Sequence, residues 1–276
     1  MRMLKQLGAV VVVAVVGDVA VGATAGSWVA TLLLGVATGV LALLAYAWVV
    51  RRTEHREPVE VARAGARAAT GAGLLIGVGM FTAVIACIAL LGGYHVDGFG
   101  SVTSAAGLLG LAVVAGVTEE LVFRGILFRI VEERAGTWVA LAFTAVLFGA
   151  IHLVNPDATL WGAIAIAVEA GCMLAAAYAA TRTLWLPIGL HIGWNFAVSG
   201  IFGTEVSGAT TAAGLLHGVT SGPVILSGGA FGPEASLFAV LAGVTMMVVF
   251  LRLAHRRGRL VANPRRAARA RATATV

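Results

Sequence analysis

Long apolar runs, separated by short polar linkers, extend along almost the whole chain. Each run of about 20 apolar residues is long enough to cross a lipid bilayer as a helix. We place eight predicted spans near residues 8–25, 28–50, 71–93, 102–129, 137–154, 160–181, 185–201 and 235–254. The pattern therefore predicts an all-α fold: a polytopic membrane helix bundle of one structural domain, without a large soluble part.

Composition agrees with this prediction. Hydrophobic residues make up 59% of the 276 residues, charged residues only 12%, and the mean hydropathy is +0.96. A soluble domain has a charged fraction of about 25%, so an ordinary soluble protein is excluded. Cys87 and Cys172 both fall within apolar runs. We expect them to pack in the interior, without a disulfide framework.

The first apolar run permits two interpretations. Arg2 and Lys5, a Val-rich core and then Ala23-Thr24-Ala25 resemble a cleavable signal peptide. The apolar stretch continues past Asp18, however, which favours an uncleaved first helix.

Basic residues fall almost only in alternate linkers. Of the 19 Lys and Arg residues, two precede the first span, five lie in the linker 51–70 and eight lie from Arg252 onward. The linkers after the first, third, fifth and seventh predicted spans have none. By the positive-inside rule both termini are expected in the cytoplasm. We expect a multi-pass protein of a bacterial plasma membrane, because the excess of Ala, Val, Gly and Arg over Lys is typical of high-GC bacteria.

The chain ends in the basic segment "RRGRLVANPRRAARARATATV". We expect a solvated tail that contacts anionic lipid, at roughly 1 kcal/mol for each basic residue near the surface. Because the topology rule already explains the basic bias, no nucleic-acid partner is predicted. The sequence does not indicate an oligomeric state.

Three charged residues interrupt the apolar run "AGVTEELVFRGILF", residues 115–128. Each ionised group near the centre of a membrane helix costs about 3 kcal/mol, so all three need partners. Glu120 and Arg124 are spaced i,i+4 and can pair on one face of a helix. Glu119 lies about 100° away around the helix and needs a partner from another helix. An unpaired glutamate in such a place has the character of a general base.

Two histidines and one asparagine are the candidate partners. His152 ends "FGAIH", and His191 begins "HIGWN", which places Asn195 on the same helical face. The alternative is a structural network of ion pairs and hydrogen-bonded core histidines. The other histidines lie outside the predicted spans: His55, His95, His217 and His255.

In this order, "EELVFRG", "FGAIH" and "HIGWN" resemble the three motifs EExxxR, FxxxH and HxxxN of the CPBP family of intramembrane endopeptidases. That family includes type II CAAX prenyl endopeptidases and bacteriocin-processing or immunity proteins. The resemblance covers about residues 105–200. It divides the chain into N-terminal membrane helices (1–100), catalytic helices (101–201), and an outer linker, last helix and basic tail (202–276).

The resemblance implies an endopeptidase that hydrolyses a peptide bond of a membrane-associated protein or peptide. It makes Glu119 the general base, which with His152 activates a water. It assigns stabilisation of the oxyanion to His191 and Asn195. It further implies that Glu120 and Arg124 fix the helix structurally.

Two alternatives remain open at this point. A zinc-dependent version of the protease would use Glu119, His152 and His191 as a His₂Glu set. The sequence has no H-E-x-x-H pair and the family is generally treated as metal-independent, so no cofactor is predicted. A non-proteolytic protein would be a transporter with a Glu–His proton relay or an immunity protein that only binds. Transporters often contain internal repeats, and none is apparent.

Simple counting raises a geometric question about a shared site. At about 1.5 Å per helical residue, Glu119 lies roughly 15 Å from the cytoplasmic side, His191 roughly 9 Å and His152 more than 20 Å. A common site therefore requires tilted or shifted helices. Glu169, in the sixth predicted span, is a further candidate to line the cavity. The linker 202–234, rich in Gly, Ser and Thr, is expected to form a structured cap.

Overall fold

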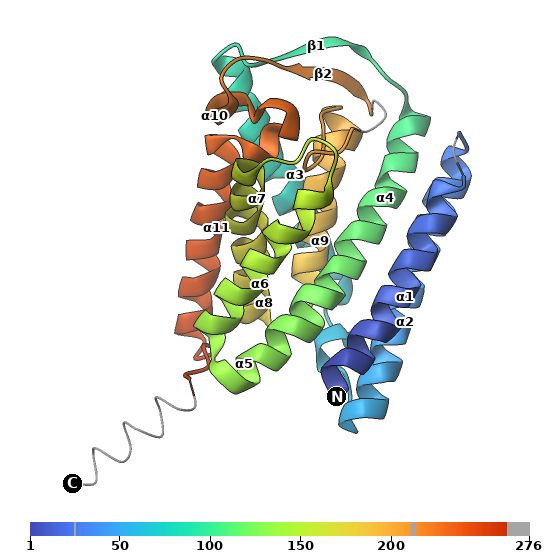
Figure 1. Cartoon of the computed structure of the whole chain (residues 1–276), viewed down its shortest axis with the longest axis vertical. Coiled ribbons are helices and arrows are strands. Elements are labelled where there is room, and N and C mark those ends of the chain that lie inside the picture. The colour runs from blue at the N-terminus through green and yellow to red at the C-terminus, as the bar shows by residue number, and fades with distance from the viewer. Residues whose placement is uncertain (25, 211–213, 264–276) are drawn as a thin grey trace, which may run out of the picture.

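The computed structural model describes residues 1–24, 26–210 and 214–263, and these are mostly helical (Figure 1). The main helices are α1 (Arg2–Gly22), α2 (Trp28–Glu54), α3 (Ala66–Leu90), α4 (Val102–Glu120), α5 (Arg129–Ala135), α6 (Thr137–Ile151), α7 (Leu160–Ile166), α8 (Met173–Thr181), α9 (Trp185–Asn195) and α11 (Leu237–Arg256). Three π-helical segments join α4 to α5, join α7 to α8, and prolong α9: Leu121–Phe128, Ala167–Cys172 and Phe196–Ile201.

Polar residues at the edges of the apolar runs start several helices. The side chains of Ser27, Ser101, Thr159 and Ser236 each accept a hydrogen bond from a backbone N–H in the first turn of α2, α4, α7 and α11. Such caps satisfy donors that have no partner within the helix. The chain can therefore turn between adjacent apolar runs with few linker residues.

Seven helices in the described residues are long and apolar enough to cross a membrane. Seven of the eight predicted spans are thereby confirmed as long apolar helices, and the remaining one, residues 185–201, is shorter. Residues 185–201 are helical, but α9 has 11 residues and its π-helical extension six, which is at the lower end of the roughly 17–25 residues that a crossing takes. Neighbouring helices enclose this segment, and most of its residues are buried. Because other helices surround the segment, its length does not have to match the thickness of the hydrocarbon core of the bilayer.

Close backbone contact fixes α9 against α3. Gly73 and Gly77 on α3 face Gly189 and Gly193 on α9, and a Cβ at any of the four would lie 2.2–2.4 Å from a backbone oxygen of the other helix. Stripes of small residues let membrane helices approach this closely. His191 lies between the two glycines of α9, so the contact with α3 sets its position.

The linker before α11 forms a cap at the end of the bundle opposite Met1 (Figure 1). In the cap, β1 (Tyr94–Phe99) pairs antiparallel with β2 (Leu216–Thr220). The short helix α10 (Val224–Ser227) and two 3₁₀ turns, Gly229–Phe231 and Pro233–Ala235, then lead back to the bundle. The described part of 202–234 thus confirms the structured cap.

Charged side chains link the helices at the other end. Arg129 donates hydrogen bonds to the two oxygens of Glu54, at 2.8 and 2.9 Å, and to Gln6 of α1, at 3.1 Å. Arg56 donates to both oxygens of Glu60, at 2.7 and 3.0 Å. This ionic cluster joins α1, α2 and the linker after α2 to the end of the π-helical segment that follows α4.

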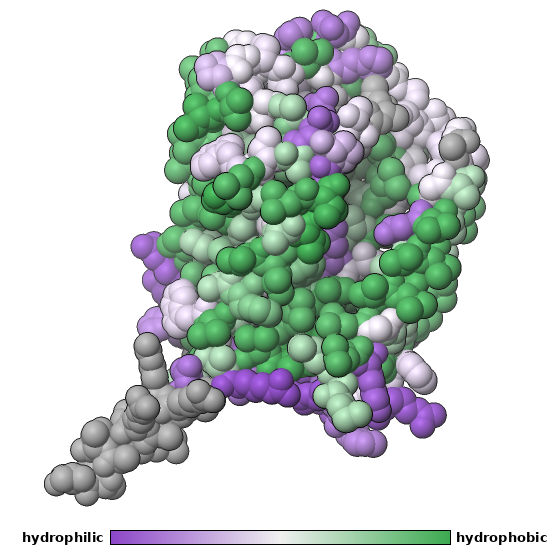
Figure 2. Space-filling model, viewed as in Figure 1, coloured by the Kyte–Doolittle hydropathy of each residue, from purple (hydrophilic) through white to green (hydrophobic). Residues whose placement is uncertain are grey.

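The surface is banded in the way a membrane protein requires. Figure 2 shows apolar residues over the middle of one face and hydrophilic residues along the end that holds the N-terminus. Together with the seven long apolar helices, this banding identifies a multi-pass membrane protein. The tail from residue 264, for which contact with anionic lipid is predicted, lies outside the described residues.

Candidate active site

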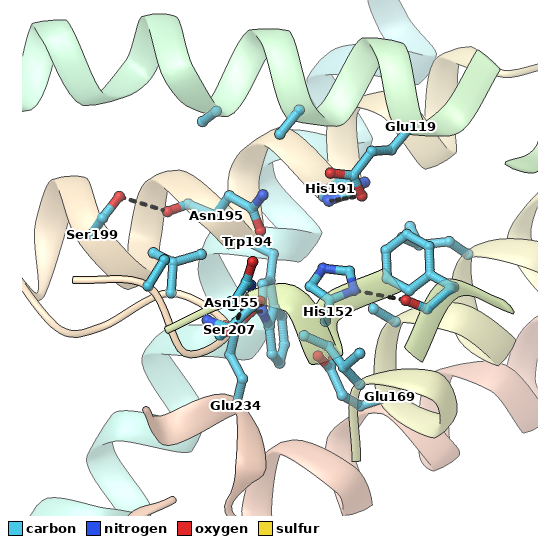
Figure 3. Close-up of a pocket in the computed structure, with 18 of the residues that line it drawn as sticks. Glu119, His152, Asn155, Glu169, His191, Trp194, Asn195, Ser199, Ser207 and Glu234 are labelled. Atoms are coloured by element: carbon cyan, nitrogen blue, oxygen red, sulfur yellow. Dashed lines mark hydrogen bonds and ion pairs between the residues drawn. The ribbon is translucent and has the colours of Figure 1, made fainter. Parts of the chain in front are cut away.

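A cavity of about 320 Å³ lies inside the bundle (Figure 3). Its lining includes all four residues that the motifs single out, Glu119, His152, His191 and Asn195. The difference in depth expected from residue counting does not keep them apart, because α4 and α6 are inclined within the bundle (Figure 1). The prediction that these side chains converge on one polar cavity is confirmed.

Glu119 faces His191 across the contact between α4 and α9. The distance from Glu119 Oε2 to His191 Nε2 is 3.9 Å, which is an ion-pair distance but too long for a hydrogen bond. Glu119 Oε2 is buried and accepts no hydrogen bond from a described residue. This carboxylate oxygen therefore has a fixed position but no hydrogen-bond donor among the described residues. It is free to accept a hydrogen bond from a water or a proton from the substrate.

Glu120 binds both a cation and a histidine. Its Oε1 lies 2.6 Å from Arg124 Nη1, so the i,i+4 pairing expected from the sequence is present, and 3.0 Å from His191 Nδ1. Since a carboxylate only accepts, His191 must donate from Nδ1. The tautomer is thereby fixed, and Nε2 is the nitrogen directed toward Glu119 and the cavity.

Arg124 joins α4 to the π-helical segment of residues 167–172. Its Nη2 donates to the carbonyl oxygens of Ala170 and Gly171, at 3.1 and 3.0 Å, and its guanidinium lies 4.8 Å from the centre of the Phe148 ring. The side chain is fully buried. These contacts hold the helices that carry the site at fixed separations, because each is made deep inside an apolar core.

His152 enters the cavity from the end of α6. Its Nδ1 lies 2.7 Å from the backbone oxygen of Phe148, and that oxygen can only accept. Neutral His152 therefore carries its proton on Nδ1, and its Nε2 is left as an acceptor toward the cavity. The ring packs on Phe148 with 4.9 Å between ring centres, which fixes its orientation.

Asn195 lies one turn after His191 on the same face of α9, as its spacing predicts. Figure 3 shows both side chains on the wall of the cavity formed by this helix. Within the described part of the chain, no hydrogen bond occupies the Asn195 side-chain amide, whereas its backbone oxygen accepts one from Ser199 at 3.1 Å. The amide is thus available to donate to a bound oxygen.

Each of the three helices that build the deep part of the cavity contains a π-helical segment. One begins directly after Glu120, one contains Glu169, and one begins directly after Asn195. A π turn widens the helix and rotates the following side chains, and such turns are frequent at functional sites. Helical periodicity in the sequence cannot distinguish these turns from ordinary α-helix, so this feature was not predicted.

The cap contributes residues that the sequence did not indicate. Glu234 accepts hydrogen bonds from Trp194 Nε1, at 2.8 Å, and from the backbone N–H and the hydroxyl of Ser207. Asn155 donates to the backbone oxygen of Ser207 at 2.7 Å. Burial raises the pKa of Glu234 despite these hydrogen bonds. No local pattern marks Glu234, because it belongs to the site only through the path of the cap.

The described residues contain no group of three His, Cys, Asp or Glu side chains placed to hold a metal ion. The predicted alternative, a His₂Glu zinc set of Glu119, His152 and His191, therefore does not fit this arrangement.

The part of the sequence that forms this site matches a known protein family. Residues 101–197 match the family model of type II CAAX prenyl endopeptidase Rce1-like proteins. The match covers about a third of the chain, and this third carries the motifs. This confirms the resemblance to CPBP endopeptidases, and all seven residues that define the three motifs lie within the matched range. The likeness of this segment to a family of peptidases suggests peptidase activity, with a protein or peptide as substrate. No curated protein and no solved structure matches the chain.

Proposed function

We propose that the protein is an intramembrane glutamic endopeptidase that hydrolyses a peptide bond of a membrane-associated protein or peptide. One observation carries the proposal: Glu119, His152, His191 and Asn195, from three separate helices, line the same internal cavity. The cavity combines an unsaturated carboxylate with hydrogen-bond donors inside an apolar bundle. That combination is what hydrolysis of an amide requires.

In the proposed first step, Glu119 accepts a proton from a water that attacks the carbonyl carbon of the substrate. His152 Nε2 acts as a second acceptor for the same water from the opposite wall (Figure 3). The new C–O bond forms as the carbonyl π electrons move onto oxygen. Two acceptors hold the water better than one, because they fix both its position and the direction of its lone pair.

Asn195 and His191 stabilise the negative oxygen of the tetrahedral intermediate. Asn195 donates from its amide, and His191 donates from Nε2 when it is protonated on both nitrogens. Collapse of the intermediate breaks the C–N bond, and Glu119 returns its proton to the leaving amine. The atoms balance, because one water is consumed and an acid and an amine are released.

We infer that α9 and its extension make an eighth crossing of the membrane. Met1 and the end of α11 lie at the same end of the bundle, so the chain must cross an even number of times (Figure 1). The short crossing runs from the end of α8 back to the cap, inside a ring of longer helices. The distribution of Lys and Arg then favours both termini in the cytoplasm of a bacterial cell.

The test is cleavage of apolar reporter peptides by the purified protein in lipid nanodiscs. We expect wild-type protein to release a product that mass spectrometry assigns to hydrolysis of one peptide bond. Glu119→Gln should abolish the product, whereas Glu57→Gln, at an exposed glutamate paired with Arg51, should not. Absence of any product from folded wild-type protein across a varied peptide set would favour a non-proteolytic immunity or transport function instead.

A further inference from the structure

The wall of the cavity that lies opposite Glu119 holds a carboxylate without a partner. Glu169 is completely buried, and neither of its side-chain oxygens has a hydrogen-bond partner among the described residues. Figure 3 shows it on the side of His152 that faces away from Glu119. An ionised carboxylate in this position lacks a donor, and a neutral one lacks an acceptor for its O–H. Both forms are costly without a ligand.

Packing holds Glu169 where it is. It lies in the π-helical segment of residues 167–172, and a Cβ at Gly243 of α11 would lie 2.4 Å from the Cα of Glu169. The α11 backbone therefore presses directly against the back of this residue. The side chain cannot turn away toward α11, so it remains directed into the cavity.

Glu234 provides a second carboxylate nearby. It is 2% exposed, and its partners Trp194 and Ser207 are uncharged donors. Glu169 and Glu234 both line the cavity, and Figure 3 shows both on the side of His152 that faces away from Glu119. The cap side of the cavity thus places two buried carboxyl groups near one histidine.

No built-in cation balances these carboxylates. The described residues that line the cavity include no Lys and no Arg. The nearest buried guanidinium, Arg124, is bound to Glu120 and to the carbonyl oxygens of Ala170 and Gly171. At the other side of the cavity, by contrast, Glu119 faces His191, and behind them Glu120 pairs with Arg124. Carboxyl groups without a neighbouring cationic side chain are thus confined to the part of the cavity that Glu169 and Glu234 line.

We propose that Glu169 and Glu234 form a subsite for the cationic side chain of a substrate lysine or arginine, close to the bond that is cleaved. The inference rests on the proposed endopeptidase function and specifies its substrate class. A buried carboxylate pair without a counter-ion binds a protonated amine or guanidinium and discriminates against a neutral side chain of the same length. The substrate thereby supplies the positive charge that the cavity lacks.

Binding to the catalytically inactive Glu119→Gln protein in nanodiscs tests this separately from cleavage. The probes are N-acetylated apolar peptides in which a single lysine moves one position at a time, each with a glutamine twin. At one position the lysine peptide should bind at least about tenfold more tightly than its twin. Adding Glu169→Gln should remove this advantage, and adding Glu57→Gln should leave it unchanged.

Two further peptide probes keep the test valid even if the Glu169→Gln variant folds poorly, because they change the peptide and leave the protein unchanged. Acetyl-lysine at the same position keeps the length and removes the charge, so it should bind like glutamine without any change to the protein. If Glu169→Gln lowers the folded yield, the acetyl-lysine comparison still decides the matter. A peptide with a free N-terminal amine and no lysine should gain nothing, and an equal gain there would overturn the assignment to a side chain.

The outcomes separate this inference from the proposed function. If wild-type protein cleaves the peptides without preferring lysine or arginine at any position, the subsite is wrong and the endopeptidase stands. If lysine binding depends on Glu169 but nothing is cleaved, the endopeptidase is wrong and the cation site stands. A lysine advantage that survives Glu169→Gln overturns the subsite.

Discussion

His191 is bound through Nδ1 to Glu120, at 3.0 Å, while its Nε2 faces Glu119 at 3.9 Å. Two glutamates that are adjacent in the sequence thus engage the two nitrogens of one imidazole. Glu120 has a structural role, since the same oxygen that binds His191 also pairs with Arg124. Glu119 has an oxygen that accepts no hydrogen bond from a described residue, and its side chain, unlike the fully buried Glu120, lines the cavity.

The first prediction separates the roles of the two glutamates. Arg124→Ala should lower both folded yield and activity, because it leaves Glu120 buried without its cation, at a cost of about 3–5 kcal/mol. Glu119→Gln should abolish activity and keep the folded yield, since this side chain has no strong partner to lose. Yield by size-exclusion chromatography and thermal unfolding in detergent measure the difference. Equal loss of folded protein in both variants would remove the distinction.

The second prediction concerns the oxyanion. Asn195→Ala should reduce kcat by about 10²–10³-fold, the usual effect of losing one donor to a developing negative charge, with little change in unfolding temperature. Ser199→Ala is the matched control, because its hydroxyl binds the backbone oxygen of Asn195 and leaves the amide alone. A loss confined to KM would mean that Asn195 binds substrate and does not stabilise the transition state.

The third prediction concerns metal. We expect activity to persist in strong chelator and the purified protein to contain no stoichiometric zinc, because a zinc enzyme loses its activity when the metal is removed. Inductively coupled plasma mass spectrometry and a chelator titration measure this. Stoichiometric zinc that disappears on mutation of His152 or His191, with activity restored by added metal, would contradict the glutamate mechanism while keeping the site.

The fourth prediction concerns pH and the ionic cluster at the end that holds the N-terminus. Burial alone opposes ionisation of Glu60, but hydrogen bonds from Arg56 and Tyr46 outweigh it and lower its pKa. The unfolded chain has a Glu pKa of about 4.3. Glu60 therefore contributes stability above that pH, and the contribution is lost as the pH falls through the lower folded-state pKa.

Thermal unfolding between pH 7 and pH 3 measures this effect. Wild-type protein should lose stability over the acidic part of the range, and Glu60→Gln should be less stable at pH 7 with a smaller loss on acidification. Glu57→Gln is the control, because Glu57 is exposed and pairs only with Arg51. An unchanged pH dependence in Glu60→Gln would show that other carboxylates cause the acid sensitivity.

Much of the fold could be predicted because each long helix is apolar along its whole length. The exception was residues 185–201, where hydropathy suggested a span like the others. Hydropathy does not distinguish a helix that faces lipid from one that other helices surround, and α9 is of the second kind. Boundaries such as those of α3 moved by a few residues, since polar caps and tertiary contacts decide where a helix ends.

The candidate site could be predicted only where its residues repeat along one helix. Glu120 with Arg124 and His191 with Asn195 follow from i,i+4 spacing. The approach of His152 to these residues depends on the inclination of α6, and the tautomer of His191 depends on a contact between helices. Glu234 reaches the cavity through the cap, a long-range path that leaves no pattern in the sequence.

The four glycines between α3 and α9 have a consequence for how much of the chain an active enzyme needs. The segment that matches the protease family begins at residue 101. The helix α3, which ends at Leu90, lies before it, and its backbone contact with α9 helps to set the position of His191. A fragment of residues 101–201 would carry every motif and lack the surface against which α9 is aligned. The smallest active fragment of the proposed enzyme should therefore include α3, because two glycines of this helix allow α9 to pack closely enough to hold His191 in place.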